Sequence, residues 1–187
     1  EGEFITSEVE RRVREKKIKL NDFVVLYRTN AQSRAIEESF LRAGFPYKII
    51  GGIKFFQRKE IKDVLAFLRL CVNRNDAMAL ARVLDIPARF LPPTIAGGRK
   101  PERINLLLST LQEKSTALKL TDFLSYTITH AGFEAWLHDG TERGEERWDN
   151  VRELLSVCTK YDSEPPQQAI RMLLEEAALT QETDNVE

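Results

Sequence analysis

The sequence is poor in cysteine and contains no long apolar segment. It holds 2 cysteines in 187 residues, Cys71 and Cys158, and neither has another cysteine or a histidine close by. Both lie within apolar helical patterns, so we expect core residues rather than metal or redox sites. The two histidines, His130 and His138, lack further ligands at metal-site spacing, which argues against a zinc site. No apolar run approaches the roughly 18 to 20 residues that a membrane-spanning helix needs.

The beginning of the sequence also lacks the features of a secretion signal. Glu1, Gly2 and Glu3 provide neither a basic start nor an apolar segment. The composition, with 42% hydrophobic and 30% charged residues, is that of an ordinary folded protein. We therefore expect a globular cytoplasmic protein without a membrane partner.

Signatures of catalytic and nucleotide sites are missing as well. The sequence has no GxxxxGK[ST] phosphate loop, no GxSxG and no HExxH. Paired acids such as Glu37 and Glu38 fall on predicted helices among bases, where a solvated helix face is the ordinary interpretation. Taken alone, the residues indicate no catalytic group and no metal site.

The small net charge of −1 conceals an asymmetry along the chain. Residues 1–75 hold 16 Lys and Arg against 10 Asp and Glu, whereas residues 76–187 hold 12 against 19. A polyanion would therefore bind the first part, although the bases also suit solvated helix faces.

The first part of the chain is patterned as helix, strand, helix and strand. The predicted elements are a helix over residues 3–17, a buried strand over 23–26, a helix from 31 to Gly44 and a short strand over 47–50. This is a βαβ unit of a parallel sheet. Because two parallel strands cannot bury themselves, we expect further strands beside them from elsewhere.

Everything after about residue 57 is helical in pattern. We predict an apolar stripe from Ile61 to Val72, a short helix capped by Asn75 or Asp76 that ends before Pro87, a long loop over 90–101, and helices at about 102–113, 122–138, 146–160 and 166–179. The predicted fold class is mostly α, with a partial α/β segment followed by a helical domain.

The stretch YRTNAQSR, residues 27–34, is an unusually polar exit from the first predicted strand. In a parallel sheet, ligands meet the loops at the carboxyl ends of strands. Arg28 suits a phosphate and Asn30 suits a nucleic-acid base or backbone. The same residues also suit a structural role, in which Asn30 caps the next helix and Arg28 pairs with Glu37 or Glu38.

The second polar cluster is GGIKFFQRKEIKD, residues 51–63. Gly51 and Gly52 permit a sharp exit from the second strand. Phe55 and Phe56 lie among four bases, so they suit stacking on nucleic acid, although aromatics packed into a core are the more frequent case.

These clusters resemble one family. YRTNAQSR, FPYKIIGG and FFQRKEIKDVLAFLRL, with ERWDNVRELLSV and LLEEAAL further on, are similar to the UvrD/PcrA/Rep branch of superfamily 1 DNA helicases. The resemblance implies that residues 1–56 belong to the second RecA-like motor domain, called 2A. Residues 57–187 would be the helical accessory domain inserted in it, called 2B.

The resemblance also implies particular site residues. Arg28 and Asn30 would contact single-stranded DNA, with Arg34 as a weaker candidate. Gly51 and Gly52 would form the hinge between 2A and 2B. Three further bases, Lys54, Arg58 and Lys62, would approach the DNA junction.

One segment departs from the family pattern. Where such helicases usually carry a TPxRGIG-like turn that grips duplex DNA, this chain reads IPARFLPP, residues 86–93. The glycines are gone, and Pro92 and Pro93 have no backbone N–H to donate to phosphates. A duplex grip by this loop is therefore not expected with the same strength.

The function that the resemblance implies is ATP-dependent, 3′ to 5′ unwinding of DNA in repair or replication. ATP and Mg²⁺ would bind elsewhere in the intact protein, so this fragment is expected to be inactive by itself. Its partners would be single-stranded and junction DNA, with proteins docking on the helical domain. The alternative is a regulatory or protein-docking domain with little DNA contact; a helicase-nuclease would need an acidic metal cluster that this sequence lacks.

Overall fold

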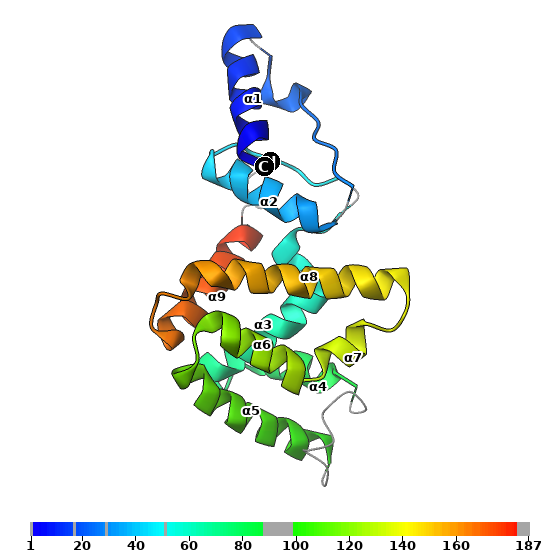
Figure 1. Cartoon of the computed structure of the whole chain (residues 1–187), viewed down its shortest axis with the longest axis vertical. Coiled ribbons are helices and arrows are strands. Elements are labelled where there is room, and N and C mark those ends of the chain that lie inside the picture. Colours follow the sequence, from blue (N-terminus) through cyan, green and yellow to red (C-terminus); the bar gives the residue numbers. More distant parts are fainter. Residues whose placement is uncertain (1, 17, 29, 51, 88–98, 183–187) are drawn as a thin grey trace. The chain divides into compact units, whose positions relative to one another are not determined.

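A computed structural model describes residues 2–16, 18–28, 30–50, 52–87 and 99–182. It is mostly helical (Figure 1). The elements are α1 (Gly2–Lys16), η1 (Leu20–Asp22), α2 (Asn30–Arg42), η2 (Phe55–Gln57), α3 (Lys59–Val72), α4 (Ala77–Asp85), α5 (Lys100–Ala117), α6 (Leu120–His130), α7 (Phe133–Leu137), α8 (Glu142–Cys158), η5 (Thr159–Tyr161) and α9 (Pro166–Glu182). The chain divides into two compact units, Glu1–Phe55 and Phe56–Glu187, called unit 1 and unit 2 below.

Unit 1 is built on the packing of α1 against α2. The helices approach closely at Gly2, where an added Cβ would lie 2.1 Å from Ser39 Oγ. Helix α2 ends at Arg42, and Gly44 just beyond it adopts a positive φ of 70°. The N–H of Phe45 donates to Phe40 O at 2.9 Å and the N–H of Gly44 donates to Leu41 O at 3.1 Å, which is the hydrogen-bond pattern of a Schellman C-cap.

The two predicted strands are not formed in the part of the chain that the structure describes. Residues 23–28 and 47–50 carry no strand pairing. Val24 and Leu26 are 77% and 90% exposed, and Ile50 is 86% exposed. A strand exists only when a neighbour accepts and donates its backbone hydrogen bonds. The described residues therefore do not form the predicted βαβ segment.

Unit 2 is organised around α3. Its apolar stripe is fully buried, with Ile61, Val64, Phe67 and Leu68 each at 0% exposure. Helix α3 contacts α4, α5, α6, α8 and α9, and the Phe67 ring meets Phe133 edge-on at 5.8 Å. A helix that is apolar on most of its surface is stable only when neighbours surround it. The sequence prediction of a helical domain after residue 57 is thus confirmed.

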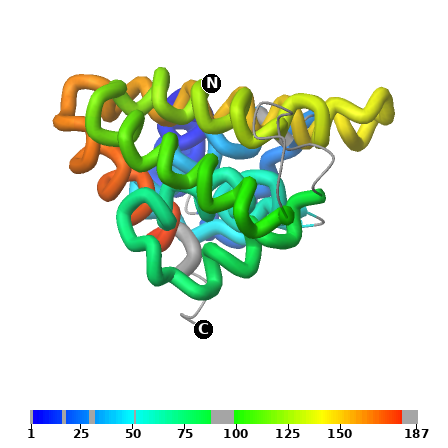
Figure 2. The backbone as a smooth tube through the Cα atoms, turned by 90° about the horizontal axis from the view of Figure 1, so that it is seen from below, coloured from blue at the N-terminus to red at the C-terminus, as the bar shows by residue number. Residues whose placement is uncertain are grey.

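The helix boundaries differ from the prediction in two places. One helix expected over 122–138 is two helices, α6 and α7, because Gly132 between them adopts a φ of 71°. Helix α5 begins at Lys100, so Pro101 lies in its first turn rather than in the loop, a position that proline tolerates. Helix α6 lies beside α8 in both views (Figures 1 and 2).

Several expected local features are confirmed. Asp76, not Asn75, caps α4 by accepting from the Ala79 N–H at 2.9 Å. Phe55 and Phe56 are 1% and 4% exposed, as core aromatics are. Cys71 and Cys158 are buried free thiols, and burial raises the pKa of Cys71 to about 12. That shift keeps the Cys71 thiol protonated, which suits a packing role.

Candidate nucleic-acid interface

Arg28 lies at the end of the extended segment that leads into α2. Its backbone N–H donates to Gln32 Oε1 at 3.0 Å. This hydrogen bond fixes the backbone just before α2 begins. The side chain of Arg28 is exposed and lines a hollow of about 430 Å³ with Phe4, Leu26 and Tyr27. Its guanidinium makes no ion pair with any described residue. Arg28 is therefore positioned to meet an external anion.

The predicted structural partners of Arg28 are engaged elsewhere. The Glu38 carboxylate accepts from Arg34 at 3.1 Å and from Arg42 at 3.2 Å. Glu37 accepts from the Ser33 hydroxyl at 3.1 Å. The alternative in which Arg28 pairs with Glu37 or Glu38 is thus not what the structure has.

Arg34 is placed differently from Arg28. Its side chain is 11% exposed, pairs with Glu38 and lies over the Phe55 ring at 5.5 Å from the centroid. These contacts give Arg34 a structural role within unit 1. Asn30 is the first residue of α2, but its side chain lies outside the described residues.

Of the two predicted hinge glycines, the structure describes Gly52. Gly51 lies outside the described residues. Gly52 is exposed and is not among the glycines with a positive φ. An added Cβ at Gly52 would lie 3.0 Å from Ile49 Cγ2 and 3.4 Å from Tyr27 Oη. A side chain at position 52 would therefore crowd Ile49, while the backbone conformation there does not call for glycine.

Two of the predicted DNA-contacting bases are buried. Lys54 is 8% exposed and lies over the Tyr47 ring at 5.4 Å. Arg58 is 6% exposed, and its Nη1 donates to Asn150 Oδ1 at 2.7 Å. Asn150 Nδ2 in turn donates to Glu60 Oε1 at 2.6 Å. This buried network joins the start of α3 to α8, so Arg58 serves the interior of unit 2 in this structure.

Lys62 is the predicted base of unit 2 that reaches the surface. It lines a hollow of about 570 Å³, which we call the α3–α4 groove. The groove is lined by Lys59, Lys62, Asp63, Leu65, Ala66 and Arg69 of α3, by Met78, Ala79, Ala81, Arg82 and Asp85 of α4, and by Ile86 and Trp136. The structure thus brings Lys62 together with three further bases that are not among the predicted site residues.

The bases of the groove differ in how they are held. Arg82 Nη1 pairs with Asp63 Oδ1 at 2.8 Å. Burial raises the pKa of the Asp63 carboxyl, and the Arg82 guanidinium opposes that rise. Lys59 Nζ lies over the Trp136 ring at 6.0 Å. Lys62 and Arg69 make no ion pair with a residue that the structure describes.

Helical spacing in the sequence predicts part of the lining of this groove. Lys59, Lys62 and Arg69 are spaced by three and seven residues, which places them near one face of a helix. Met78 and Trp136 have no such spacing relation to them, since they come from other helices. Only the packing of α3, α4 and α7 brings them to one place.

The described residues also limit the chemistry of the chain. Within the described ranges, no group of three or more His, Cys, Asp or Glu side chains is arranged to hold a metal ion. None of the described helices combines the length and the apolar character needed to cross a bilayer. The departure from the family pattern at 86–93 falls largely on residues 88–93, which lie outside the described ranges.

Comparison with known proteins identifies the family. The sequence profile of the UvrD-like helicase C-terminal domain matches residues 1–132. The chain belongs to this family. The match covers all of unit 1 and continues through α3 to α6, ending at Gly132, the residue that separates α6 from α7.

Relatives of this UvrD-like helicase C-terminal domain are DNA helicases. The chain is 29% identical over 219 aligned positions to the ATP-dependent DNA helicase PcrA of Staphylococcus aureus (strain Mu50 / ATCC 700699), covering 100% of this chain and 30% of the relative. It is 31% identical to PcrA of Bacillus subtilis (strain 168), covering 100% and 29%. DNA helicase II of Haemophilus influenzae is 33% identical, covering 86% and 26%.

The chain therefore spans less than a third of the length of these relatives. The alignment with the S. aureus protein has 219 positions, more than the 187 residues of this UvrD-like chain. The relative consequently carries additional residues within the same span. The resemblance to UvrD and PcrA that the sequence motifs indicated is confirmed.

Proposed function

We propose that this chain is part of an ATP-dependent DNA helicase that unwinds duplex DNA in the 3′ to 5′ direction during repair or replication. Unit 1 is a segment of the 2A motor domain and contributes to the track for single-stranded DNA. Unit 2 is the mobile 2B accessory domain, joined to 2A through Gly51 and Gly52. ATP and Mg²⁺ serve the intact protein at a site outside this chain, which has no phosphate loop of its own.

The exposed apolar side chains of unit 1 support its assignment to a larger sheet. Val24, Leu26 and Ile50 alternate with less exposed neighbours along two extended segments. Such alternation is typical of strands that lie in a sheet. We infer that these segments become strands when the rest of the motor domain supplies their neighbours.

The observation that carries the proposed DNA contact is the state of Arg28. A guanidinium held in the open at the end of a strand-like segment, without a carboxylate partner among the described residues, suits a phosphate oxygen. Asn30, two residues further on, would contact the same strand. Lys62, half-buried on α3, is the candidate of unit 2 for a contact with the DNA junction.

The Arg28→Ala variant of the longer helicase tests this contact. We expect its affinity for a single-stranded oligonucleotide to fall about tenfold at low salt, because one charge-assisted phosphate contact is lost. The slope of log affinity against log salt should become shallower by about 0.7. Fluorescence anisotropy over a salt series measures both quantities, and a tailed duplex measures unwinding.

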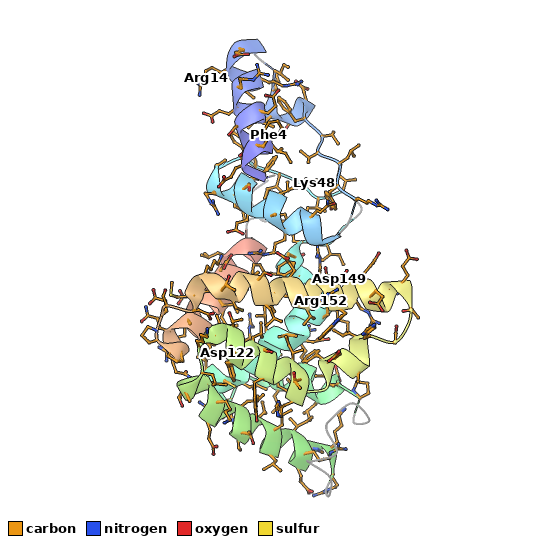
Figure 3. The ribbon with its side chains drawn as sticks, viewed as in Figure 1. Phe4, Arg14, Lys48, Asp122, Asp149 and Arg152 are labelled. Atoms are coloured by element: carbon orange, nitrogen blue, oxygen red, sulfur yellow. The ribbon has the colours of Figure 1, made fainter. Side chains whose placement is uncertain are left out.

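Arg14→Ala is the matched control. Arg14 is an arginine of unit 1 that extends from α1 (Figure 3), with a 76% exposed side chain that pairs with Glu10. It should leave affinity, salt slope and unwinding unchanged. If the Arg28 and Arg14 variants bind and unwind DNA equally well, Arg28 does not contact the DNA strand.

A second function is favoured by the charge of unit 2. The unit contains 17 Lys and Arg against 21 Asp and Glu, and residues 86–93 lack the glycines of a duplex-gripping turn. In this alternative, unit 2 regulates the motor or docks proteins and contacts little DNA. Binding of a duplex with a 3′ tail to unit 2 would then show almost no salt dependence, whereas phosphate contacts give a steep negative slope.

A further inference from the structure

The α3–α4 groove combines an apolar floor with an exposed apolar rim. Its floor includes Leu65 and Ala79, both 3% exposed, and Ile86 at 1%. On its rim, Met78 is 83% exposed. Methionine is flexible and polarizable, and it is frequent on surfaces that bind apolar side chains of varied shape. The volume of about 570 Å³ accommodates a large side chain with room around it.

The rim of the same groove is basic. Lys62 and Arg69 are seven residues apart on α3, which corresponds to about 10 Å along the helix. Neither pairs with a described carboxylate, and Arg82 already neutralises Asp63. Asp85 is the other acid of the lining. A positive rim is thus maintained on a unit in which acids outnumber bases.

We propose that the α3–α4 groove docks an acidic amphipathic helix of a protein partner. One apolar side chain of that helix enters the hollow and covers Met78 and Trp136. Carboxylates two turns apart on the helix meet Lys62 and Arg69, whose spacing they match. This docking competes with the DNA-junction contact proposed above for Lys62, and it does not depend on the DNA contact of Arg28.

A protein segment fits the groove better than a nucleic acid does. A phosphate backbone would satisfy Lys62 and Arg69, but it would leave the 83% exposed side chain of Met78 in water. Protein interfaces place an apolar centre inside a polar rim, which is the arrangement of this groove. The exposed apolar side chain of Met78 therefore distinguishes this surface from an ordinary phosphate-binding patch.

The intrinsic fluorescence of Trp136 provides a local readout. The chain has 2 tryptophans, so Trp148→Phe leaves Trp136 as the single tryptophan. The probe is a synthetic helical peptide with glutamates two turns apart and leucines on its other face, titrated into the full 187-residue chain. We expect saturable change in Trp136 emission, with affinity lowered about tenfold by Arg69→Glu and severalfold by Met78→Ser.

Matched controls lie on α9, away from the groove lining. Arg171→Glu repeats the charge change, and Leu179→Ser removes an exposed apolar side chain, 66% exposed in the structure. Neither should alter peptide affinity, and circular dichroism checks that all four variants remain folded. A scrambled peptide of the same composition should bind at least tenfold more weakly.

Three results would overturn the proposal. The first is an unchanged Trp136 emission at saturating peptide concentrations. The second is an equal loss of affinity in the α9 variants, which would indicate general charge attraction. The third is a duplex oligonucleotide that changes Trp136 emission while the peptide does not, since that would assign the groove to nucleic acid.

Discussion

The two units differ in how completely they bury their own apolar residues. Unit 2 surrounds α3 on several sides, and side chains such as Phe67 and Leu68 have no exposure. Among the described residues of unit 1, Val9 and Phe55 are the buried hydrophobic side chains, while Phe4, Val24, Leu26, Ile50 and Ile53 are at least 60% exposed. Unit 2 therefore has a core of its own, whereas unit 1 leaves these apolar side chains exposed.

This difference indicates where stability and function reside. Burial of apolar area is the main favourable contribution to folding. A helical unit with a continuous core can move as a body, as the accessory role proposed for unit 2 requires. A unit with uncovered strand-like segments is instead suited to be part of a larger sheet.

Producing the two units separately is the strongest test of the difference in burial between them. We expect residues 56–187 alone to unfold cooperatively on heating, with a Tm close to that of the whole chain. Residues 1–55 alone should show no cooperative transition, because 55 residues without a closed core cannot offset their conformational entropy. Circular dichroism at the helix signal measures both. Cooperative melting of the isolated first unit would reverse this conclusion.

Single side chains should show the same contrast. Phe67→Ala removes a fully buried ring that packs on Phe133, so we expect a loss of about 3 to 5 kcal/mol in the free energy of unfolding. Leu26→Ala, at a side chain 90% exposed, should change it by less than about 0.5 kcal/mol. Urea denaturation compares the two. Similar losses would mean that unit 1 buries Leu26 in solution.

The buried polar network of unit 2 should contribute less than its apolar core. Asn150→Ala removes the acceptor of Arg58 and the donor to Glu60, with an expected loss of about 1 to 3 kcal/mol. Asn105, exposed on α5, gives the control Asn105→Ala, for which we expect no measurable change. Equal stability of both variants would show that the Arg58 network is dispensable.

The smallest expected effect lies on the surface of unit 1. Hydrogen bonds from Arg11 and Arg12 lower the pKa of Glu8 from its ordinary 4.5 to about 2. Because the folded pKa lies below the unfolded one, the stabilisation of α1 is complete above about pH 4.5 and is lost as the pH falls through about 2. NMR titration of the Glu8 carboxyl measures the pKa. Since the site is exposed, high salt should return it towards 4.5.

The helices were predictable from sequence because their information is local. Apolar spacing located α3 and α8, Gly44 located the end of α2, and Asp76 located the start of α4. The predicted domain boundary after residue 56 and the division after Phe55 differ by one residue. The break at Gly132 was missed because an isolated glycine within a helical pattern is ambiguous.

The site was less predictable because its contacts join distant parts of the sequence. The burial of Arg58 depends on Asn150, 92 residues away. Local sequence shows only that Arg58 is a base among bases. The groove around Lys62 likewise needs Met78 and Trp136. The predicted strands failed for the same reason, since strand formation depends on partners that local sequence does not contain.

Amide hydrogen exchange over residues 23–28 and 47–50 tests the central claim most directly. The claim is that these segments are strands of a helicase motor domain that lack their neighbours in this chain. We predict fast exchange at these amides in the 187-residue chain and strong protection of the same amides in the longer helicase, while α3 is protected in both. Protection already present in the 187-residue chain, or fast exchange in the longer helicase as well, would contradict it.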